Sequence, residues 1–358
     1  MKLLVVHPGA QTSTADVADG LYYGLEQHGI DLVRYRLDHR IDRSHRWLHY
    51  NWRRTKKKNA SLERPTTGDI FYQAGIGALE MALRHQVDAV FVVSAMFLHP
   101  DVIVLMKRAG LRVVVLFTES PYDSEKELAI AKLVDGCWTN ERSSVDAFEA
   151  VNCRSGYLAH AWHPVKHLAG LFASDGDVPA HDVVFVGTAF EERIDFLNAI
   201  DWTGVDLGLY GNWEVLGSRH PLRKHLKGAQ VDNATAAALY RRAKIGLNLY
   251  RTSVGFGKGT TKITHAESLN PRAYELARCG AFHLSHHRAE VADVFGDLVP
   301  TFETPAEASA LIRTWLADDV GRARVQLQLP ACVAESSWVA RAATVIGDLQ
   351  SLLQAQAA

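Results

Sequence analysis

The segment Glu267–Gly280 contains the residues best suited to chemistry, in the order Glu-Ser-Leu-Asn-Pro-Arg-Ala-Tyr-Glu-Leu-Ala-Arg-Cys-Gly. Asn270 is a favoured N-cap, Pro271 suits the first helical position, where its missing N–H costs nothing, and Gly280 suits a left-handed stop. The pattern predicts a short helix that starts at Pro271. The first turn of such a helix offers backbone N–H groups and the positive end of the dipole, and Arg272 adds a planar fork of donors. This segment therefore predicts an anion-binding site.

Two carboxylates bracket the entrance of this helix. Glu267 lies just upstream of it, and Glu275 follows eight positions later. Carboxylate oxygens accept hydrogen bonds from neutral hydroxyl groups beside a bound phosphate. A ligand that has both phosphates and sugar hydroxyls fits this pattern best. The same spacing next to a glycine-capped helix also arises by chance in many α/β proteins.

A strongly basic stretch lies nearer the amino terminus, although the formal net charge of the chain is only −1. Between Arg40 and Lys58, eight basic residues stand against the single acid Asp42, a local excess of seven positive charges, with His, Trp and Tyr interleaved. Lys and Arg neutralise phosphates, and aromatic rings stack on bases, so this stretch favours nucleic acid. The alternatives are a solvated loop, or an arm that binds anionic polysaccharide or a membrane surface.

This basic stretch is too polar for a core and too long for an ordinary connection, which predicts an insertion or an extended arm over about residues 38–66. The residues predicted to bind an acceptor in this arm are Arg46, Trp52, Arg53, Arg54, Lys56, Lys57 and Lys58.

Length and composition set the frame for these residues. The chain has 358 residues, enough for two domains that each bury a core, and its 47% hydrophobic and 22% charged residues are typical of a globular enzyme. No apolar run reaches the length of a membrane span or a signal peptide, so a cytoplasmic location is expected. The four cysteines have no C-x-x-C spacing, which supports neither a zinc site nor a disulfide framework.

Strand and helix patterns alternate along the first half of the chain. Residues 2–6, 30–36, 89–93 and 112–117 are typical of strands, with helical patterns between most of them, which predicts a parallel sheet. Glu119 and Asp123 follow the last of these strands, at the edge where open α/β sheets bind ligands. Partial burial there would raise the pKa of a carboxylate toward that of a general base, which makes these two side chains candidate catalytic residues. Capping of a turn or helix is the alternative role for Asp123.

The second half repeats the alternation. A strand over residues 182–187 ends in Gly187, and Arg193 lies one loop further on, from which a guanidinium can reach a diphosphate. A strand pattern over 245–250 leads into a loop that contains Lys258, which lacks the P-loop spacing and is better interpreted as part of a loop that closes over a donor. Asp175-Gly-Asp177 matches a D-x-D metal motif, but its distance from the helix segment favours a solvated turn, and no metal is predicted.

These motifs resemble a known family. Glu267 and Glu275 reproduce the E-x7-E spacing of GT-B glycosyltransferases, and the order Phe-Val-Gly…Arg, Tyr-Gly-x-Trp, Leu-Tyr-x-x-x-Lys-Ile-x-Leu-Asn and Asn-Pro-Arg-x-Tyr-Glu, over most of residues 115–300, is similar to the CgeB-like (spore-maturation) glycosyltransferases. The resemblance implies an α/β, GT-B fold: two Rossmann-like domains with parallel sheets that face a central cleft.

The same resemblance implies roles for single residues. Glu275 would hold the donor ribose and Glu267 would face the transferred sugar, as a catalytic residue. The donor-binding residues implied in this way are Gly187, Arg193, Lys258, Asn270, Arg272 and Glu275. Transfer would need no metal or other cofactor, because the helix dipole and basic side chains neutralise the departing diphosphate. E-x7-E slightly favours a retaining reaction, in which donor phosphate helps to deprotonate the acceptor; an inverting enzyme would need Glu119, Asp123 or a histidine as base.

The sequence therefore predicts a glycosyltransferase that moves a hexose, with UDP-glucose favoured as the nucleotide-sugar donor, to a hydroxymethylated pyrimidine base such as hydroxymethylcytosine in duplex DNA. A protein or cell-surface glycan acceptor, or a DNA-binding GT-B protein without activity, is the alternative. Residues 1–165 are expected to form an acceptor-side domain, 166–335 a nucleotide-sugar domain, and 336–358 a helix that crosses back to the first.

Overall fold

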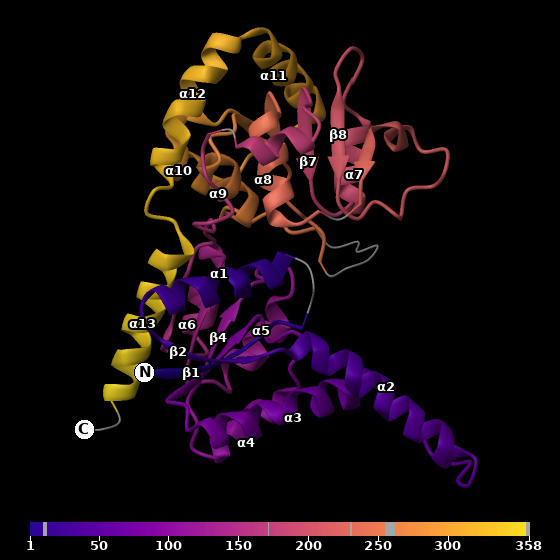
Figure 1. Cartoon of the computed structure of the whole chain (residues 1–358), viewed down its shortest axis with the longest axis vertical. Helices are drawn as coiled ribbons and strands as arrows, with labels where there is room; N and C mark the ends of the chain where they lie inside the picture. Colours follow the sequence, from indigo (N-terminus) through magenta and orange to yellow (C-terminus); the bar gives the residue numbers. More distant parts are fainter. Residues whose placement is uncertain (10–12, 171, 230, 255–261, 356–358) are drawn as a thin grey trace. The chain divides into compact units, whose positions relative to one another are not determined.

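The chain folds into two compact units. The first comprises Met1–Ala159 together with Val339–Ala358, and the second His160–Trp338. The computed structural model describes residues 1–9, 13–170, 172–229, 231–254 and 262–355. Each unit is built on one parallel β-sheet with helices packed against it (Figure 1).

The first unit contains a six-stranded parallel sheet in the order β2-β1-β3-β4-β5-β6. β1 is paired on both sides, with Leu4 opposite Val33 of β2 and Val90 of β3. The chain therefore reverses its direction of travel across the sheet between β1 and β3. The strands are β1 (Lys2–Val6), β2 (Asp31–Tyr35), β3 (Ala89–Val93), β4 (Val113–Phe117), β5 (Gly136–Thr139) and β6 (Ser155–Tyr157).

Helices cover both faces of this sheet, because the side chains of each strand alternate between the two faces. Leu4 and Val6 point into a core shared with α3, α4 and α6, where Ala78, Met106 and Phe148 are buried. Figure 1 shows α1 and α13 on the side opposite α3 and α4. The helices of this unit are α1 (Ser13–Gln27), α2 (Leu37–Lys56), α3 (Thr67–His85), α4 (Pro100–Arg108), α5 (Ser124–Ala131), the short 3-10 helix η1 (Arg142–Ser144), α6 (Val145–Glu149) and α13 (Trp338–Gln354).

The basic stretch, expected to be an insertion or an extended arm, forms a regular helix, α2. Leu37, Ile41, Ser44 and Leu48 recur at helical spacing and are buried or half-buried, while the residues between them are mostly exposed. α2 packs along α3, and Figure 1 shows its far end reaching beyond the rest of the first unit. The stretch is thus a helical arm, and its apolar stripe explains why it folds as a helix despite its charge.

The second unit contains another six-stranded parallel sheet, in the order β12-β11-β10-β7-β8-β9. In order of appearance this is 6-5-4-1-2-3, the arrangement of a dinucleotide-binding Rossmann sheet. β7 and β10 are its central pair, with Ile245 opposite Val183. The strands are β7 (Val183–Val186), β8 (Leu207–Tyr210), β9 (Leu226–Gly228), β10 (Ile245–Asn248), β11 (His283–His286) and β12 (Thr301–Phe302).

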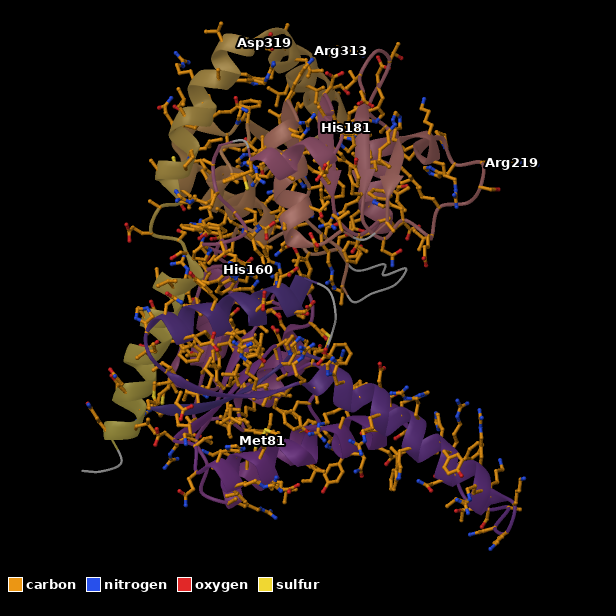
Figure 2. The ribbon with its side chains drawn as sticks, in the orientation of Figure 1. Met81, His160, His181, Arg219, Arg313 and Asp319 are labelled. Carbon is orange, nitrogen blue, oxygen red and sulfur yellow. The ribbon has the colours of Figure 1, made fainter. Side chains whose placement is uncertain are left out.

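The second unit is also covered by helices, and buried side chains fill the space between them and the sheet (Figure 2). His181, labelled in that figure, bonds Asp206 at 2.7 Å and Tyr210 at 2.9 Å, and so supports the start of β7. The helices are the 3-10 helix η2 (Ala173–Asp177), α7 (Glu191–Asn198), η3 (Pro221–His225), α8 (Asn233–Arg242), α9 (Pro271–Arg278), α10 (Ala289–Phe295), η4 (Gly296–Leu298), α11 (Pro305–Ala317) and α12 (Asp319–Cys332).

The last helix, α13, packs against the first unit. Trp138 of β5 donates its indole N–H to Asp348 at 2.9 Å, and the His28 ring bonds the Val339 carbonyl at 2.9 Å. Val345 and Leu349 of this helix are fully buried. Within the described part of the chain, no helix is both long and apolar enough to cross a membrane.

Candidate active site

The central strands of the second sheet mark the place where a ligand is expected. β7 leads the chain to one side of the sheet and β10 to the other, and open α/β sheets bind ligands outside the carboxyl ends of the strands at such a point. Val186 and Asn248 are the last residues of these two strands. α9, the helix predicted to bind an anion, starts beside them, because Asn270 and Arg272 both bond Asn248.

The capping of α9 confirms the sequence prediction. The Asn270 side chain accepts the N–H of Ala273 at 3.1 Å, with Pro271 at the first helical position. At the other end Gly280 is left-handed, with φ at +66°, and the next N–H returns to the Leu276 carbonyl at 3.0 Å. The Asn270 amide also donates to the Asn248 side chain at 2.9 Å. The N-cap therefore fixes the helix entrance to the end of β10.

Arg272 joins the ends of the two central strands. Its Nε donates to the Val186 carbonyl at 2.9 Å, and its Nη1 lies 3.2 Å from the Asn248 side-chain oxygen and 3.4 Å from the Leu249 carbonyl. Nη2 lies against Gly187, where an added β carbon would come within 2.5 Å of it. From the sequence, all the N–H donors of the Arg272 guanidinium were expected to be available to a phosphate. In this structure Nε and Nη1 are engaged by the protein, so a phosphate at this point would meet Nη2.

Three guanidinium groups gather around two phenylalanine rings at this edge. Arg272 lies over Phe185 at 4.7 Å, and Arg193, which is buried, lies 5.6 Å from the same ring and 5.0 Å from Phe190. Arg251 also lies over the Phe190 ring, at 5.2 Å from its centroid. Attraction between each guanidinium and the face of an aromatic ring helps to offset the repulsion between these like charges. Such a concentration of positive charge is suited to a diphosphate.

A fourth arginine stands at the end of the neighbouring strand. Arg288, two residues beyond β11, is buried, with its guanidinium 4.6 Å above the Tyr250 ring. Glu290 accepts the N–H of Leu269 at 2.5 Å, which ties the start of α10 to the segment before α9. Sequence reasoning missed Arg251 and Arg288. Each follows the end of a strand in the second sheet, and that position was the signal available for finding them.

The approach to residues 255–261 is anchored by a carboxylate. Glu192 accepts the N–H groups of Thr252 at 2.9 Å and Ser253 at 3.0 Å, and also the Ser253 hydroxyl at 2.7 Å. Burial alone would raise the pKa of Glu192, but these hydrogen bonds outweigh it and lower the pKa. Ser253 and Lys262 also pair in an isolated antiparallel β-bridge. Lys258, a predicted donor residue, lies outside the described residues.

The two glutamates of the E-x7-E pattern occupy different settings. Glu267 is half-buried in the segment before α9, and its carbonyl accepts the Glu290 N–H at 3.1 Å. Glu275 lies in the second turn of α9, half-buried, close enough for its charge to act on Tyr240 and Cys279. Their proposed contacts with sugar hydroxyls stay predictions.

The loop after β4 in the first unit contains the other predicted catalytic residues. Glu119 is half-buried, and Asp123 pairs with Lys126 at 2.8 Å. Asp123 occupies the N-cap position of α5 but makes no capping bond with its side chain. Glu127, which sequence reasoning missed, is fully buried beneath this loop and accepts the Glu119 N–H at 2.9 Å and the Ser120 hydroxyl. Burial raises the pKa of Glu127 to about 8.

The predicted acceptor-binding residues lie on the outer half of α2 and just beyond it. Arg46, Arg53, Lys57 and Lys58 are exposed, and none of them forms an ion pair with another described residue. Trp52 is half-buried: its indole donates to the Leu62 carbonyl at 3.2 Å. The other predicted residues here also make local contacts: Lys56 lies over the Trp52 ring at 4.6 Å, and Arg54 lies over Tyr50 at 5.5 Å. Trp52 therefore holds the returning chain against α2 rather than offering a free ring.

The D-x-D pair has a structural role that the sequence did not predict. Asp175 is buried, not solvated as expected, and binds Arg241 of α8 through both oxygens at 2.6 and 2.7 Å. This guanidinium holds the pKa of Asp175 below its usual range. No group of three or more potential His, Cys, Asp or Glu ligands occurs among the residues that the structure describes.

Comparison with known proteins defines the class of fold. The chain aligns with sucrose-phosphate synthase from Thermosynechococcus elongatus with a TM-score of 0.68 and 12% identity, covering 99% of this chain and 100% of that one. α,α-Trehalose 6-phosphate synthase from Burkholderia multivorans aligns with a TM-score of 0.60 and 11% identity, covering 99% of both chains. These structures are GT-B glycosyltransferases, and the fold of this protein is GT-B, as predicted.

Two further comparisons give a family match and another structural neighbour. Residues 192–347 match the glycosyl transferase-like family, a stretch that includes Arg193, Arg251, all of α9 and Arg288. An E. coli structure described as trehalose-6-phosphate bound with UDP-2-fluoro glucose aligns with a TM-score of 0.60 and 11% identity, covering 98% of this chain and 99% of that one. No curated protein sequence matches the chain. The matches support a glycosyltransferase.

Proposed function

We propose that this protein is a nucleotide-sugar-dependent glycosyltransferase whose donor binds at the carboxyl edge of the second sheet. The observation that carries this proposal is the gathering of the Arg193, Arg251 and Arg272 guanidiniums beside the first turn of α9. They lie at the point where the strand order reverses, within the stretch that matches the glycosyl transferase-like family. A nucleoside diphosphate is the ligand that best fits positive charge at a Rossmann switch point.

The chemistry follows from this arrangement. Breaking the bond between the sugar and the diphosphate leaves negative charge on the departing phosphate, which the guanidiniums and the α9 dipole stabilise without a metal. Glu275 would accept hydroxyl hydrogen bonds from the donor ribose, and Glu267 those from the transferred sugar. We favour retention of configuration, supported by the glycosyltransfer with retention named for an aligned trehalose-6-phosphate synthase. In that case donor phosphate takes the acceptor proton, and Glu119 or Asp123 is not needed as base.

The finer assignments are also proposals. UDP-glucose is favoured as the donor, with support from the UDP-2-fluoro glucose of the E. coli neighbour. The family match is to the glycosyl transferase-like family and does not identify the CgeB-like group. Membership of the CgeB-like group therefore stays a prediction. A hydroxymethylated pyrimidine in duplex DNA stays the proposed acceptor on the charge of α2 alone. A protein or cell-surface glycan, or DNA binding without transfer, is the alternative.

Release of nucleoside diphosphate tests the proposal. We would incubate the protein with UDP-glucose, GDP-glucose and ADP-glucose in turn, each with EDTA, and with duplex DNA that contains hydroxymethylcytosine or cytosine. The proposal predicts diphosphate release with at least one donor, and the DNA assignment predicts that only the hydroxymethylated duplex gains mass. The inactive alternative predicts DNA binding and no release. Glu275→Gln should raise the donor KM, while Glu307→Gln, an exposed residue of α11, should not.

A further inference from the structure

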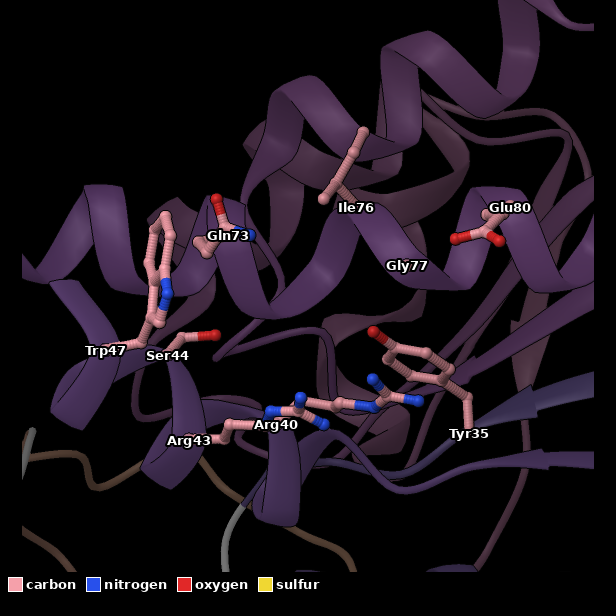
Figure 3. Close-up of a pocket in the computed structure, with 9 residues that line it drawn as sticks. All are labelled: Tyr35, Arg40, Arg43, Ser44, Trp47, Gln73, Ile76, Gly77 and Glu80. Atoms are coloured by element: carbon pink, nitrogen blue, oxygen red, sulfur yellow. The ribbon is translucent and has the colours of Figure 1, made fainter.

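α2 and α3 enclose a groove whose chemistry the donor site does not explain (Figure 3). We propose that this groove binds one nucleotide unit of a nucleic acid strand, with a phosphate between Arg40 and Arg43 and an unstacked base against Trp47. This inference rests on the proposed function, because it concerns how the acceptor is bound. Binding of a nucleic acid strand can nevertheless be measured without a donor.

The groove is large enough for a nucleotide. Its volume is about 320 Å³, within the range of small-ligand pockets. Tyr35 is one of its lining residues and donates its hydroxyl to the Ala74 carbonyl at 2.5 Å. Glycine at position 77 lets the Tyr35 ring approach α3 closely, since a β carbon there would lie 2.8 Å from the Tyr35 hydroxyl oxygen. The lining residues are Tyr35, Arg40, Arg43, Ser44, Trp47, Gln73, Ile76, Gly77 and Glu80.

Two uncompensated guanidiniums line one side of the groove. Figure 3 shows those of Arg40 and Arg43 beside each other below α3, with Arg40 lying over the Tyr35 ring at 5.4 Å. Neither forms an ion pair with a described residue. The one carboxylate of the groove, Glu80, is already paired with Arg84 of its own helix. Adjacent guanidiniums free of carboxylates are suited to a phosphate.

Trp47 supplies a flat surface at the end of the groove. Its side chain is 57% exposed, and that of Tyr50, one helical turn further, is 59% exposed. A large exposed indole is unusual on a charged helix, because burying it against α3 would be more favourable in water. Stacking of a base on the ring gives it a function, and it requires no particular base.

The same face of α2 continues the positive charge away from the groove. At 100° per residue, Arg40, Arg43, Arg46, Arg53, Arg54 and Lys57 fall on one side of the helix, and Trp47 and Tyr50 lie among them. From Arg40 to Lys57 this stripe is about 25 Å long. A small anion would occupy only the groove. A stripe of this length favours a polymer that carries phosphates at regular intervals.

The helix is less suited to a membrane surface. A membrane-bound amphipathic helix buries an apolar face among the acyl chains. The apolar residues of α2, Leu37, Ile41 and Leu48, are buried or half-buried on the opposite side. The exposed stripe offers only Trp47 and Tyr50 as large apolar groups. A nucleic acid strand therefore fits the stripe better than lipid does.

Fluorescence anisotropy with a labelled single-stranded 20-mer, without any donor, tests the inference. We expect Arg40→Ala/Arg43→Ala to weaken binding at least tenfold and to flatten its salt dependence. Trp47→Ala should weaken binding about five- to a hundredfold. In the Trp47→Phe variant, binding of the strand should no longer quench the tryptophan fluorescence of the protein. The matched control is Arg108→Ala/Lys132→Ala, which removes two exposed charges elsewhere in the first unit and should have little effect. Unchanged melting temperatures would show that all variants fold.

Competition separates this site from a general anionic surface. We expect heparin and vesicles containing phosphatidylserine to bind less tightly than the single strand, and millimolar inorganic phosphate not to displace it. The assignment would be overturned if the variants weakened heparin binding equally, if the protein preferred vesicles, or if inorganic phosphate displaced the strand. A protein that releases UDP but does not bind the 20-mer would refute this inference alone. Binding without release from any donor would refute the proposed function instead.

Discussion

Nη2 of Arg272 lies 2.5 Å from the point where a β carbon on residue 187 would stand. The absence of a side chain at Gly187 therefore allows this guanidinium to lie across the ends of β7 and β10. Because Nε and Nη1 are held by Val186, Asn248 and Leu249, the side chain has little freedom to move aside. Glycine at position 187 and arginine at position 272 form one structural unit at the switch point.

Gly187→Ala should displace the Arg272 guanidinium and weaken nucleotide binding. The added methyl group also meets Phe185 at 3.2 Å, and overpacking of this kind costs about 1–3 kcal/mol of unfolding free energy. Calorimetric titration with UDP and urea unfolding would measure the two effects. Gly217→Ala is the matched control, because its β carbon would enter open space. Equal nucleotide affinity in the two variants would remove Gly187 from the donor site.

Asn270→Ala should cost about 0.5–2 kcal/mol of stability through loss of the α9 cap. It should also weaken UDP binding, because the Asn270 amide fixes the helix entrance to Asn248. Thr304→Ala removes the N-cap of α11, whose hydroxyl accepts the Glu307 N–H at 3.2 Å, and serves as the control. The role of the cap would be supported if the two variants had similar denaturation midpoints but only Asn270→Ala bound UDP more weakly. A parallel loss of affinity in both variants would indicate general loosening of the unit.

Glu127 should give the protein a pH-dependent stability. Its pKa is about 8 in the folded protein, against 4.5 for an ordinary glutamate, so between these values the folded state binds more protons than the unfolded state. Stability from this group is complete below about pH 4.5 and falls as the pH rises towards 8, by up to about 1.4 kcal/mol per pH unit. Urea unfolding of the wild type and Glu127→Gln from pH 5 to pH 8.5 measures the difference.

Gln resembles the protonated carboxyl and should remove this decline, whereas Glu125→Gln, an exposed change in the same helix, should retain it. A stability difference between wild type and Glu127→Gln that does not vary with pH would show that Glu127 is ionised throughout the range.

Asp175→Asn should destabilise the protein by about 3–5 kcal/mol, because it leaves the Arg241 charge buried without its partner. Asp123→Asn breaks a pair whose lysine is 75% exposed and should cost no more than about 1 kcal/mol. Chemical denaturation gives both values. If Asp175 belonged instead to a metal site, added Mn²⁺ would raise the melting temperature of the wild type and not of Asp175→Asn.

Features specified by neighbouring residues were predictable from the sequence. The cap of α9 depends on Asn270, Pro271 and Gly280 within one short segment, and the alternating strands and helices that lead to a GT-B fold depend on local hydrophobic patterns. The helical nature of α2 could have been predicted from its spacing of Leu37, Ile41 and Leu48. The many charged residues between these apolar positions made the helical spacing hard to recognise.

Contacts between distant segments were beyond local reasoning. Arg272 bonds a carbonyl 86 residues away, and Asp175 meets Arg241 66 residues away, so neither the direction of the guanidinium nor the burial of the carboxylate is encoded nearby. Arg251 and Arg288 come together with the site only because parallel strands end at the same edge. Glu127 is another such case, since its raised pKa depends on burial beneath the loop that follows β4.

The crystal structure of the protein with UDP would test the donor site most directly. The account predicts the diphosphate at the first turn of α9, outside the ends of β7 and β10, with an oxygen within hydrogen-bonding distance of Arg272 Nη2 or of the Arg193 or Arg251 guanidinium. A diphosphate bound elsewhere in the second unit, or only in the first unit, would contradict it.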